Sequence, residues 1–152
     1  MISKAEEYMA LAFKEAQKAY LEEEVPIGAV VTSLAGEVLA LEHNRTRQRN
    51  DPTAHAEILA LRIAGQGLGN FRLTGAILYV TVEPCLMCAG AIIQARLAKV
   101  VYGAEDPKAG ALGSLYDISK DQRLNHRFEV IRGVGEPECR ELMQRFFKAR
   151  RG

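Results

Sequence analysis

The segment spanning residues 76–102 constrains the fold more than any other part of the chain. It begins with a continuous apolar run over residues 76–82, which is typical of a strand covered on both faces. Pro84 then starts a predicted helix over residues 85–96, and residues 98–102 form the next apolar run. A strand, a helix and a strand in this order predict a right-handed parallel crossover. The chain is therefore predicted to be an α/β protein.

The remaining segments complete a single domain around this crossover. They are predicted from hydrophobic periodicity and turn residues: a helix over 3–21, strands over 27–31 and 37–41 joined by a turn at 34–36, a helix from about 51 to 64, a short helix over 114–119, a strand over 128–132 and a helix over 137–149. Residues 44–50 and 103–113 are predicted loops. The expected architecture is a three-layer α/β/α sandwich whose mixed central sheet joins a hairpin to parallel strands.

The start and end of the second helix are predicted from its polar and glycine residues. Asp51 or Thr53 is the expected N-terminal cap, because both side chains can accept hydrogen bonds from free backbone amides. Three glycines are expected to end the helix after residue 64, namely Gly65, Gly67 and Gly69.

Length and composition agree with one folded domain, residues 1–152. Hydrophobic residues make up 48% of the chain and charged residues 26%, which excludes the disordered and fibrous classes. The N-terminal residues are charged, and the apolar stretches have the length of strands. We therefore expect neither a signal peptide nor a membrane span, and a cytoplasmic location.

Charge is informative only locally. The chain carries 20 basic and 19 acidic residues, so its net charge of +1 does not indicate a nucleic-acid partner. However, five Lys or Arg face one Glu between residues 140 and 151, and Arg45, Arg47 and Arg49 form a short basic run. These segments are either solvated faces or local sites for phosphate groups.

The unusual side chains gather at two predicted helix starts. Residues three apart share one face of a helix, so the thiols of Cys85 and Cys88 converge, and the first helical turn favours the thiolate form. With the imidazole of His55 they form a ligand set that suits Zn²⁺ and leaves one tetrahedral position open, which is the catalytic pattern. The alternatives for the two cysteines are a redox dithiol or a pair of small buried residues.

Glu57 is predicted to move protons rather than to bind metal. It lies two residues after His55, where a carboxylate can take a proton from a metal-activated water. The alternative is an exposed first-turn glutamate that the helix dipole stabilises. Cys139 lies far from the motif and is expected to pack within a helix, with a fourth ligand as the alternative, and His43 and His126 are expected to be structural histidines.

The pair of motifs, H-x-E at residues 55–57 and P-C-x-x-C at residues 84–88, resembles the signature of the zinc nucleobase deaminases. The similarity to bacterial tRNA adenosine deaminases extends over nearly the whole chain. It is carried by segments 25–29, 51–57, 78–85, 113–114, 125–127 and 146–151, together with Asn44 and Gly110. The resemblance implies a cytidine-deaminase-like fold, a zinc ion held by His55, Cys85 and Cys88, and Glu57 as the catalytic acid and base.

The resemblance also implies a reaction and a substrate. Zinc would lower the pKa of its bound water toward about 7, and the resulting hydroxide would add to C6 of adenine. Glu57 would carry the proton to N1 and then to the departing amine, giving ammonia and inosine without an organic cofactor. The implied substrate is the wobble adenosine in the anticodon loop of an arginine tRNA, read as an unstacked base.

Further residues are implied to bind substrate. Asn44 would bind the target base, with Ala56 in the same site, and the C-terminal helix would pack on the anticodon stem-loop. The implied contacts with the loop or its helix are Asp106, Lys108, Asn125, Arg127, Phe146, Phe147, Arg150 and Arg151. The alternative role of the two phenylalanines is to dock the C-terminal helix on the domain. The alternative role of Asp106 is that of a structural turn residue. The family is homodimeric, with each active site completed near the partner chain.

Two other functions compete with this interpretation. The first is a deaminase of a free base or nucleoside, of the guanine or cytosine type, on the same scaffold; the basic segments argue against it, because a small neutral substrate does not need phosphate-binding groups. The second is a non-enzymatic RNA-binding module with a structural zinc. That function would require a fourth ligand and would leave Glu57 without a role.

Overall fold

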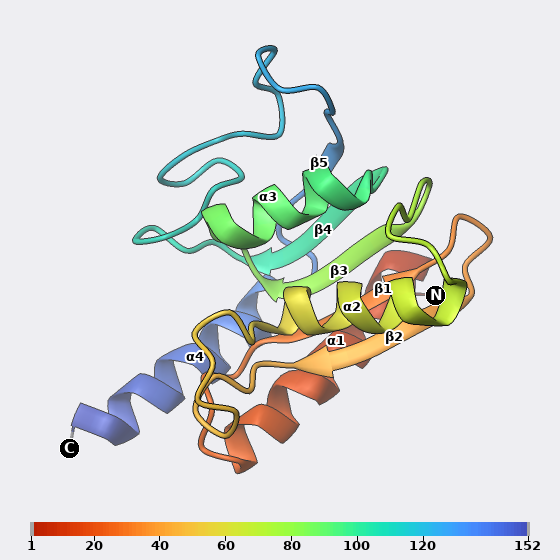
Figure 1. Cartoon of the computed structure of the whole chain (residues 1–152). Coiled ribbons are helices and arrows are strands. Elements are labelled where there is room, and N and C mark those ends of the chain that lie inside the picture. Colours follow the sequence, from red (N-terminus) through yellow and green to blue (C-terminus); the bar gives the residue numbers. More distant parts are fainter. Residues whose placement is uncertain (1, 152) are drawn as a thin grey trace.

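The computed structural model describes residues 2–151, except for the side chain of residue 151. Within this range the chain forms four helices and five strands in three layers (Figure 1). The elements are α1 (Lys4–Leu21), β1 (Gly28–Thr32), β2 (Val38–His43), α2 (Ala56–Leu68), β3 (Ile77–Val82), α3 (Leu86–Ala95), β4 (Lys99–Ala104), β5 (Glu129–Ile131) and α4 (Glu136–Arg151).

The sheet is mixed, as the sequence predicts. Its strand order is β2-β1-β3-β4-β5. Strand β1 is antiparallel to both β2 and β3, whereas β3, β4 and β5 are parallel. The hairpin and the crossover are therefore both confirmed, and β1 joins them into one sheet.

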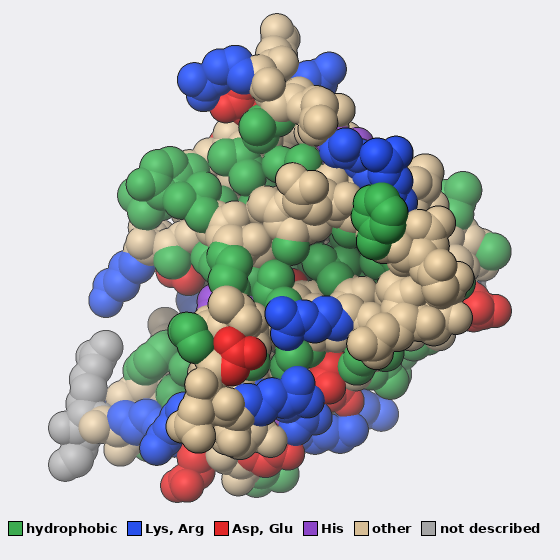
Figure 2. Space-filling view, viewed as in Figure 1, with side chains coloured by type: hydrophobic (Ala, Val, Ile, Leu, Met, Phe, Trp, Pro, Cys, Tyr) green, Lys and Arg blue, Asp and Glu red, His purple; other side chains and the backbone are tan. Residues whose placement is uncertain are grey.

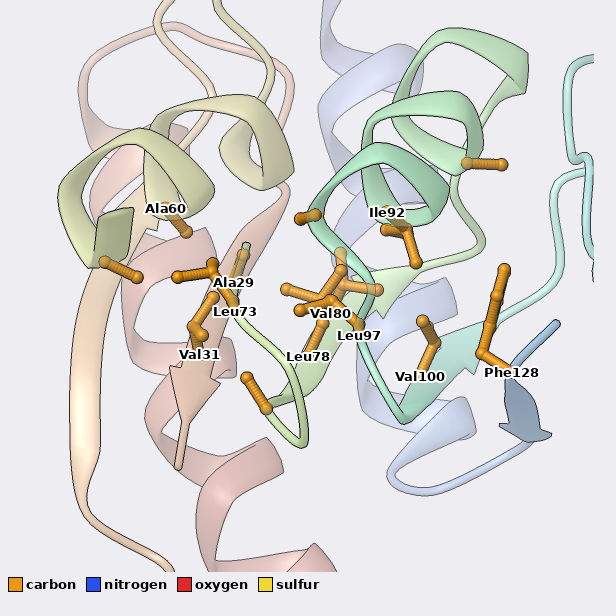
Figure 3. Close-up of a cluster of buried hydrophobic side chains, with 14 of the residues drawn as sticks. Ala29, Val31, Ala60, Leu73, Leu78, Val80, Ile92, Leu97, Val100 and Phe128 are labelled. Carbon is orange, nitrogen blue, oxygen red and sulfur yellow. The ribbon is translucent and has the colours of Figure 1, made fainter. Parts of the chain in front are cut away.

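The helices cover both faces of the sheet, which confirms the three-layer α/β/α architecture. Helices α1 and α4 pack on one face and α2 and α3 on the other (Figure 1). Side chains of β3 alternate between the two sides: Leu78 and Val80 belong to the core beneath α2 and α3 (Figure 3), and Tyr79 packs against α1. This burial on both faces explains why residues 76–82 form a continuous apolar run.

The N-terminal boundary of α2 differs from the prediction. The helix starts at Ala56 with His55 as its N-cap residue, whereas the Asp51 carboxylate accepts the backbone N–H and hydroxyl of Thr53 in a preceding turn. Asp51 therefore caps a turn rather than the helix, because an aspartate can satisfy the amide two residues ahead without helical geometry.

The helix also continues past the first two glycines. It includes Gly65 and Gly67 and ends at Leu68, with Gly69 as its C-cap residue, whose φ of 66° is the left-handed conformation that glycine favours. The buried face of α2, including Ala60 and Ala64, packs on the sheet and offsets the weak helix propensity of glycine, about 1 kcal/mol per residue.

The predicted short helix over 114–119 is wrong. This segment is a set of turns in which Leu112 pairs with Asp117 in an isolated bridge and the Asp117 carboxylate accepts the backbone N–H and hydroxyl of Ser119. Hydrogen bonds from Ser114 to the Glu83 carboxylate bind the start of the segment to the end of β3. Side chains thus satisfy backbone groups that a helix would otherwise pair.

None of the helices in residues 2–151 is both long enough and apolar enough to span a membrane.

Candidate active site

The three predicted metal ligands meet at the N-terminal ends of α2 and α3. His55 is the N-cap residue of α2, Cys85 is the N-cap residue of α3, and Cys88 lies in the first turn of α3. The Nδ1 atom of His55 lies 3.4 Å from Sγ of Cys88 and 3.7 Å from Sγ of Cys85, and all three ligand atoms lie within 4.8 Å of one another. One metal ion can therefore contact all three.

The protonation of the two cysteines is coupled. The Cys88 thiol donates a hydrogen bond to Cys85, which lowers the pKa of Cys85 to about 3 against the opposing effect of burial, and His55 contributes to the same shift. The same hydrogen bond, together with burial, raises the pKa of the Cys88 thiol. A hydrogen bond to Cys85 also raises the pKa of His55. The surroundings of Cys85 therefore favour its thiolate form, which is the form that binds a metal ion.

Glu57 is buried beside this triad. Its side chain is 3% exposed, and its Oε1 atom has no hydrogen-bond partner among the described residues. Burial raises the pKa of this carboxyl to about 7. The predicted alternative, an exposed first-turn glutamate, is excluded. A buried carboxylate oxygen without a partner and a nitrogen–sulfur–sulfur donor set together fit a zinc ion and a water molecule at this site.

Asn44 lies next to the triad across a short loop. Arg45 N donates a hydrogen bond of 3.0 Å to Ala54 O. Asn44 directly precedes Arg45 and His55 directly follows Ala54, so this bond brings their backbones together. Asn44 is 4% exposed, and its Nδ2 atom donates to Val25 O at 3.4 Å. The structure thus brings the predicted base-binding residue to the predicted metal site, and buried Ala56 follows His55 directly.

A second group of predicted residues lines a cavity of about 730 Å³ between the loop after β4 and helix α4. Asp106, Lys108 and Phe147 lie on its wall, with Arg140 and Lys148 beside them. Asp106 also serves as a turn residue, because its Oδ1 atom accepts the backbone N–H groups of Lys108 and Ala109. The structure therefore brings together an exposed lysine, a half-exposed aromatic ring and a carboxylate from distant parts of the sequence.

Asn125 and Arg127 do not join either group within one chain. The Oδ1 atom of Asn125 accepts a hydrogen bond from Arg96, the C-cap residue of α3. Cys85 is the N-cap residue of the same helix, and ten helical residues span about 15 Å. These two predicted contacts thus lie at the opposite end of α3 from the metal ligands.

The C-terminal helix divides its predicted residues between packing and exposure. The Phe146 ring is buried and packs edge-on against Tyr20, with the Arg150 guanidinium 3.7 Å above its centre. Arg150 also donates a hydrogen bond to Glu23 O at 3.1 Å. Phe146 therefore docks α4 onto the domain, which is the alternative role predicted for it. Phe147 instead is 40% exposed and lines the cavity. The side chain of Arg151 lies outside the described residues.

Sequence reasoning missed two buried glutamates, and both histidines outside the motif are structural as expected, since His126 Nε2 contacts Leu97 O at 2.7 Å. Glu24 accepts the backbone N–H groups of Arg47 and Gln48, and Glu83 accepts three backbone N–H groups of the loop after β4. The signal for Glu83 was its position, a charged residue at the end of a fully apolar strand. His43 is a satisfied structural histidine whose ring nitrogens contact the carboxylates of Glu15 and Glu22.

Comparison with known sequences decides the family. The sequence model of the MafB19-like deaminases matches residues 3–151. A tRNA-specific adenosine deaminase of Bacillus subtilis is 48% identical over 93% of this chain and 87% of its own length, and one of Agrobacterium fabrum is 48% identical over 95% and 94%. The chain belongs to the tRNA-specific adenosine deaminase family. This membership confirms the resemblance that the motifs indicate and makes the protein a hydrolytic deaminase.

Solved structures of the deaminases agree with this assignment. A structure from a study of A-to-I editing by tRNA deaminases at the wobble position of transfer RNA superimposes with a TM-score of 0.86 at 48% identity, covering 90% of this chain and 98% of that one. A guanine deaminase of Bacillus subtilis is 40% identical with a TM-score of 0.62, over 66% of this chain and 64% of that one. The cytidine-deaminase-like fold is therefore confirmed.

Proposed function

We propose that this protein converts the wobble adenosine in the anticodon loop of an arginine tRNA to inosine. The observation that carries the proposal is the buried Glu57 carboxylate beside the triad of His55, Cys85 and Cys88. The identity of 48% to relatives named as tRNA-specific adenosine deaminases supports the choice of substrate. A tRNA substrate would place the enzyme in the cytoplasm.

The triad would hold the zinc ion, and Glu57 would carry the proton. Zinc bound there would supply the Lewis acidity that makes a water molecule nucleophilic at neutral pH. A carboxyl whose pKa burial raises to about 7 can both accept and donate a proton near neutrality. Glu57 would take the proton from the attacking water, deliver it to N1 of adenine and then assist departure of the C6 amine. Water and adenosine are consumed, and inosine and ammonia are released.

The site offers groups that could orient the base. Asn44 is held by its contact with Val25 and would hydrogen-bond the target base. Ala56, the first residue of α2, has a backbone N–H that α2 itself does not use, because the first N–H groups of a helix lack intrahelical partners. Both groups belong to a buried wall, so an unstacked base would be read there without competition from water.

The cavity beside α4 would receive the anticodon loop. Lys108 would contact backbone phosphate, Phe147 offers an aromatic face for stacking, and Asp106 holds the turn that carries Lys108. The helix that bears Phe146, Arg150 and Arg151 would pack against the same RNA. These positions supply charge and aromatic surface that a free base would not need.

A homodimer would bring the remaining residues to the site. The outer side of α2 and α3 carries a cavity of about 880 Å³, and hydrophobic side chains gather on this face in Figure 2. Phe71 is 80% exposed there and Leu61 lines the same cavity. Exposed apolar surface of this kind marks protein interfaces. A second copy packed on this face would allow Asn125 and Arg127 of one chain to reach the active site of the other.

A second candidate is deamination of free guanine. The observation that favours it is the 40% identity to the Bacillus subtilis guanine deaminase over two thirds of this chain. The wall formed by Lys108, Arg140, Lys148 and Phe147 argues for a larger anionic substrate.

The proposal is tested with an arginine tRNA anticodon stem-loop that carries adenosine at the wobble position. We expect stoichiometric inosine at that position and none at adenosines elsewhere in the loop, read by nucleoside analysis of defined fragments. A purified, zinc-loaded protein that leaves the wobble adenosine intact contradicts the proposed function.

A further inference from the structure

Glu83 is a buried carboxylate with an unusual set of partners. It follows β3, lies two residues before Cys85 and is 3% exposed. Its Oε1 atom accepts a hydrogen bond from Asp106 N at 3.0 Å and a short one from the Ser114 hydroxyl. Its Oε2 atom accepts from Leu112 N at 2.9 Å and from Ser114 N at 3.1 Å. Every donor belongs to one loop, residues 105–114.

The loop is shaped around this carboxylate. A Cβ atom at Gly110 would collide with the Glu83 carboxylate, so only glycine fits there while this carboxylate keeps its position. The loop also pairs with the metal-ligand segment, because Ala111 N donates to Pro84 O at 2.9 Å and Gly110 forms a bridge with Cys85. Glu83 thus lies between the loop and the segment that holds Cys85.

The partners of Glu83 are neutral donors rather than a cation. No lysine, arginine or histidine among the described residues forms a salt bridge with it. A buried carboxylate needs such donors to replace its lost hydration, and the buried N–H of Leu112 in turn needs the carboxylate as its acceptor. The Glu83 carboxylate therefore anchors the loop at Asp106, Leu112 and Ser114, beside the backbone contacts of residues 110 and 111 with the segment that holds Cys85.

We propose that Glu83 is a positioning residue that holds residues 105–114 in the conformation in which Asp106 and Lys108 contact the substrate. The substrate part of this inference rests on the proposed function. The backbone N–H of Asp106 is bound by Glu83, and the Asp106 carboxylate in turn accepts the backbone N–H of Lys108, so the backbone that carries the lysine is fixed from the buried carboxylate outward. Glu83 would act on the substrate through this loop, since its side-chain hydrogen bonds all go to residues 106, 112 and 114.

Glu83→Gln tests the proposal with little change in volume. The amide can place its NH₂ group toward the Ser114 hydroxyl, which can turn to accept, but Asp106 N then faces a donor. In the other orientation the NH₂ group faces the backbone N–H groups of Leu112 and Ser114, which are also donors and cannot turn to accept. The substitution therefore releases the loop at Asp106 first, and trypsin reports this release at the exposed Lys108.

The matched control is Glu24→Gln. Glu24 is also buried and also accepts two backbone N–H groups, those of Arg47 and Gln48, but in a different loop. We expect Glu83→Gln to speed tryptic cleavage after Lys108 about tenfold, the factor for the loss of one hydrogen bond to a charged group, while Glu24→Gln leaves that cleavage unchanged and speeds cleavage after Arg47. A general loss of stability would affect both sites in both variants.

Kinetics then test the link to substrate. For the anticodon stem-loop we expect Glu83→Gln to raise KM about tenfold, with kcat changed about twofold at most and zinc content unchanged. Unchanged cleavage after Lys108 overturns the proposal, as does faster cleavage without a rise in KM. If the wild type does not deaminate the stem-loop, the proposed function fails and the substrate part of the inference with it, whereas the cleavage measurement still decides whether Glu83 holds the loop.

Discussion

The metal site and the proposed RNA surface are assembled in different ways. The three proposed metal ligands come from two helix starts, and their donor atoms lie within 4.8 Å of one another. The proposed RNA contacts lie in three places: the cavity beside α4, the far end of α3, and the contact between α4 and Tyr20. A metal ion is small and requires convergence within one chain, whereas a nucleic acid can be bound by groups spread over a wide surface.

The largest effect expected from this difference concerns the metal. Cys88→Ala should lose the zinc and with it all deamination. The substitution removes one of only three protein side chains in the proposed zinc site, and the two that remain should bind the ion too weakly. Metal analysis after dialysis measures the loss. Cys139→Ala is the control: this thiol is buried against Gly103 rather than near the triad, so zinc content should stay at one ion per chain. Loss of zinc in the Cys139 variant would support a structural four-ligand site instead.

The next effect separates proton transfer from metal binding. Glu57→Gln should retain zinc but lower kcat by about 10²–10⁴, because the amide keeps the shape of the buried side chain and cannot carry the proton. Single-turnover inosine formation and metal analysis on the same sample measure both quantities. Wild-type rates in this variant would remove Glu57 from the chemistry.

The proposed metal site and the sheet also show which features the sequence predicts and which it does not. The convergence of Cys85 and Cys88 was predictable from helical spacing, whereas the place of His55 and Glu57 beside them was indicated by the motif pair; the parallel crossover was predictable because apolar runs reveal buried strands. The strand order was not predictable. Strand β1 pairs with β3 although residues 33–76 lie between them, and no local pattern encodes a pairing between segments so far apart in the sequence.

The role of Glu83 was hidden for a related reason. Its donors lie more than 20 residues away in the sequence, in the loop over residues 105–114, and no local pattern links that loop to Glu83. The packing role of Arg150 was equally hidden from the sequence. A basic residue in a basic tail indicates phosphate binding, whereas the structure places its guanidinium over the Phe146 ring.

A smaller effect distinguishes a phosphate contact from a packing contact. Lys108→Ala should weaken binding of the anticodon stem-loop and reduce the slope of log affinity against log salt by about 0.7, because one neutralised phosphate is lost, while thermal stability stays the same. Titrations at several salt concentrations measure the slope. A slope equal to that of the wild type would mean that Lys108 does not contact phosphate.

The smallest expected effect concerns Arg150. Arg150→Ala should lower the free energy of unfolding by about 1 kcal/mol, because the cation–π contact with Phe146 and the hydrogen bond to Glu23 are both removed at an exposed position. Urea denaturation measures the change, with Lys148→Ala as a control from the same helix. Equal stability of the two variants would show that Arg150 does not anchor α4.

The most direct test of a tRNA substrate compares four compounds at two ionic strengths: the anticodon stem-loop, free adenosine, guanine and cytosine. We predict that the stem-loop has by far the largest kcat/KM and that its value falls as salt rises. The three small substrates should react poorly at either salt concentration, because contacts with the loop supply binding energy that is used in the transition state. Efficient deamination of guanine or cytosine without salt dependence would contradict the tRNA substrate and leave only the hydrolytic chemistry of the metal site.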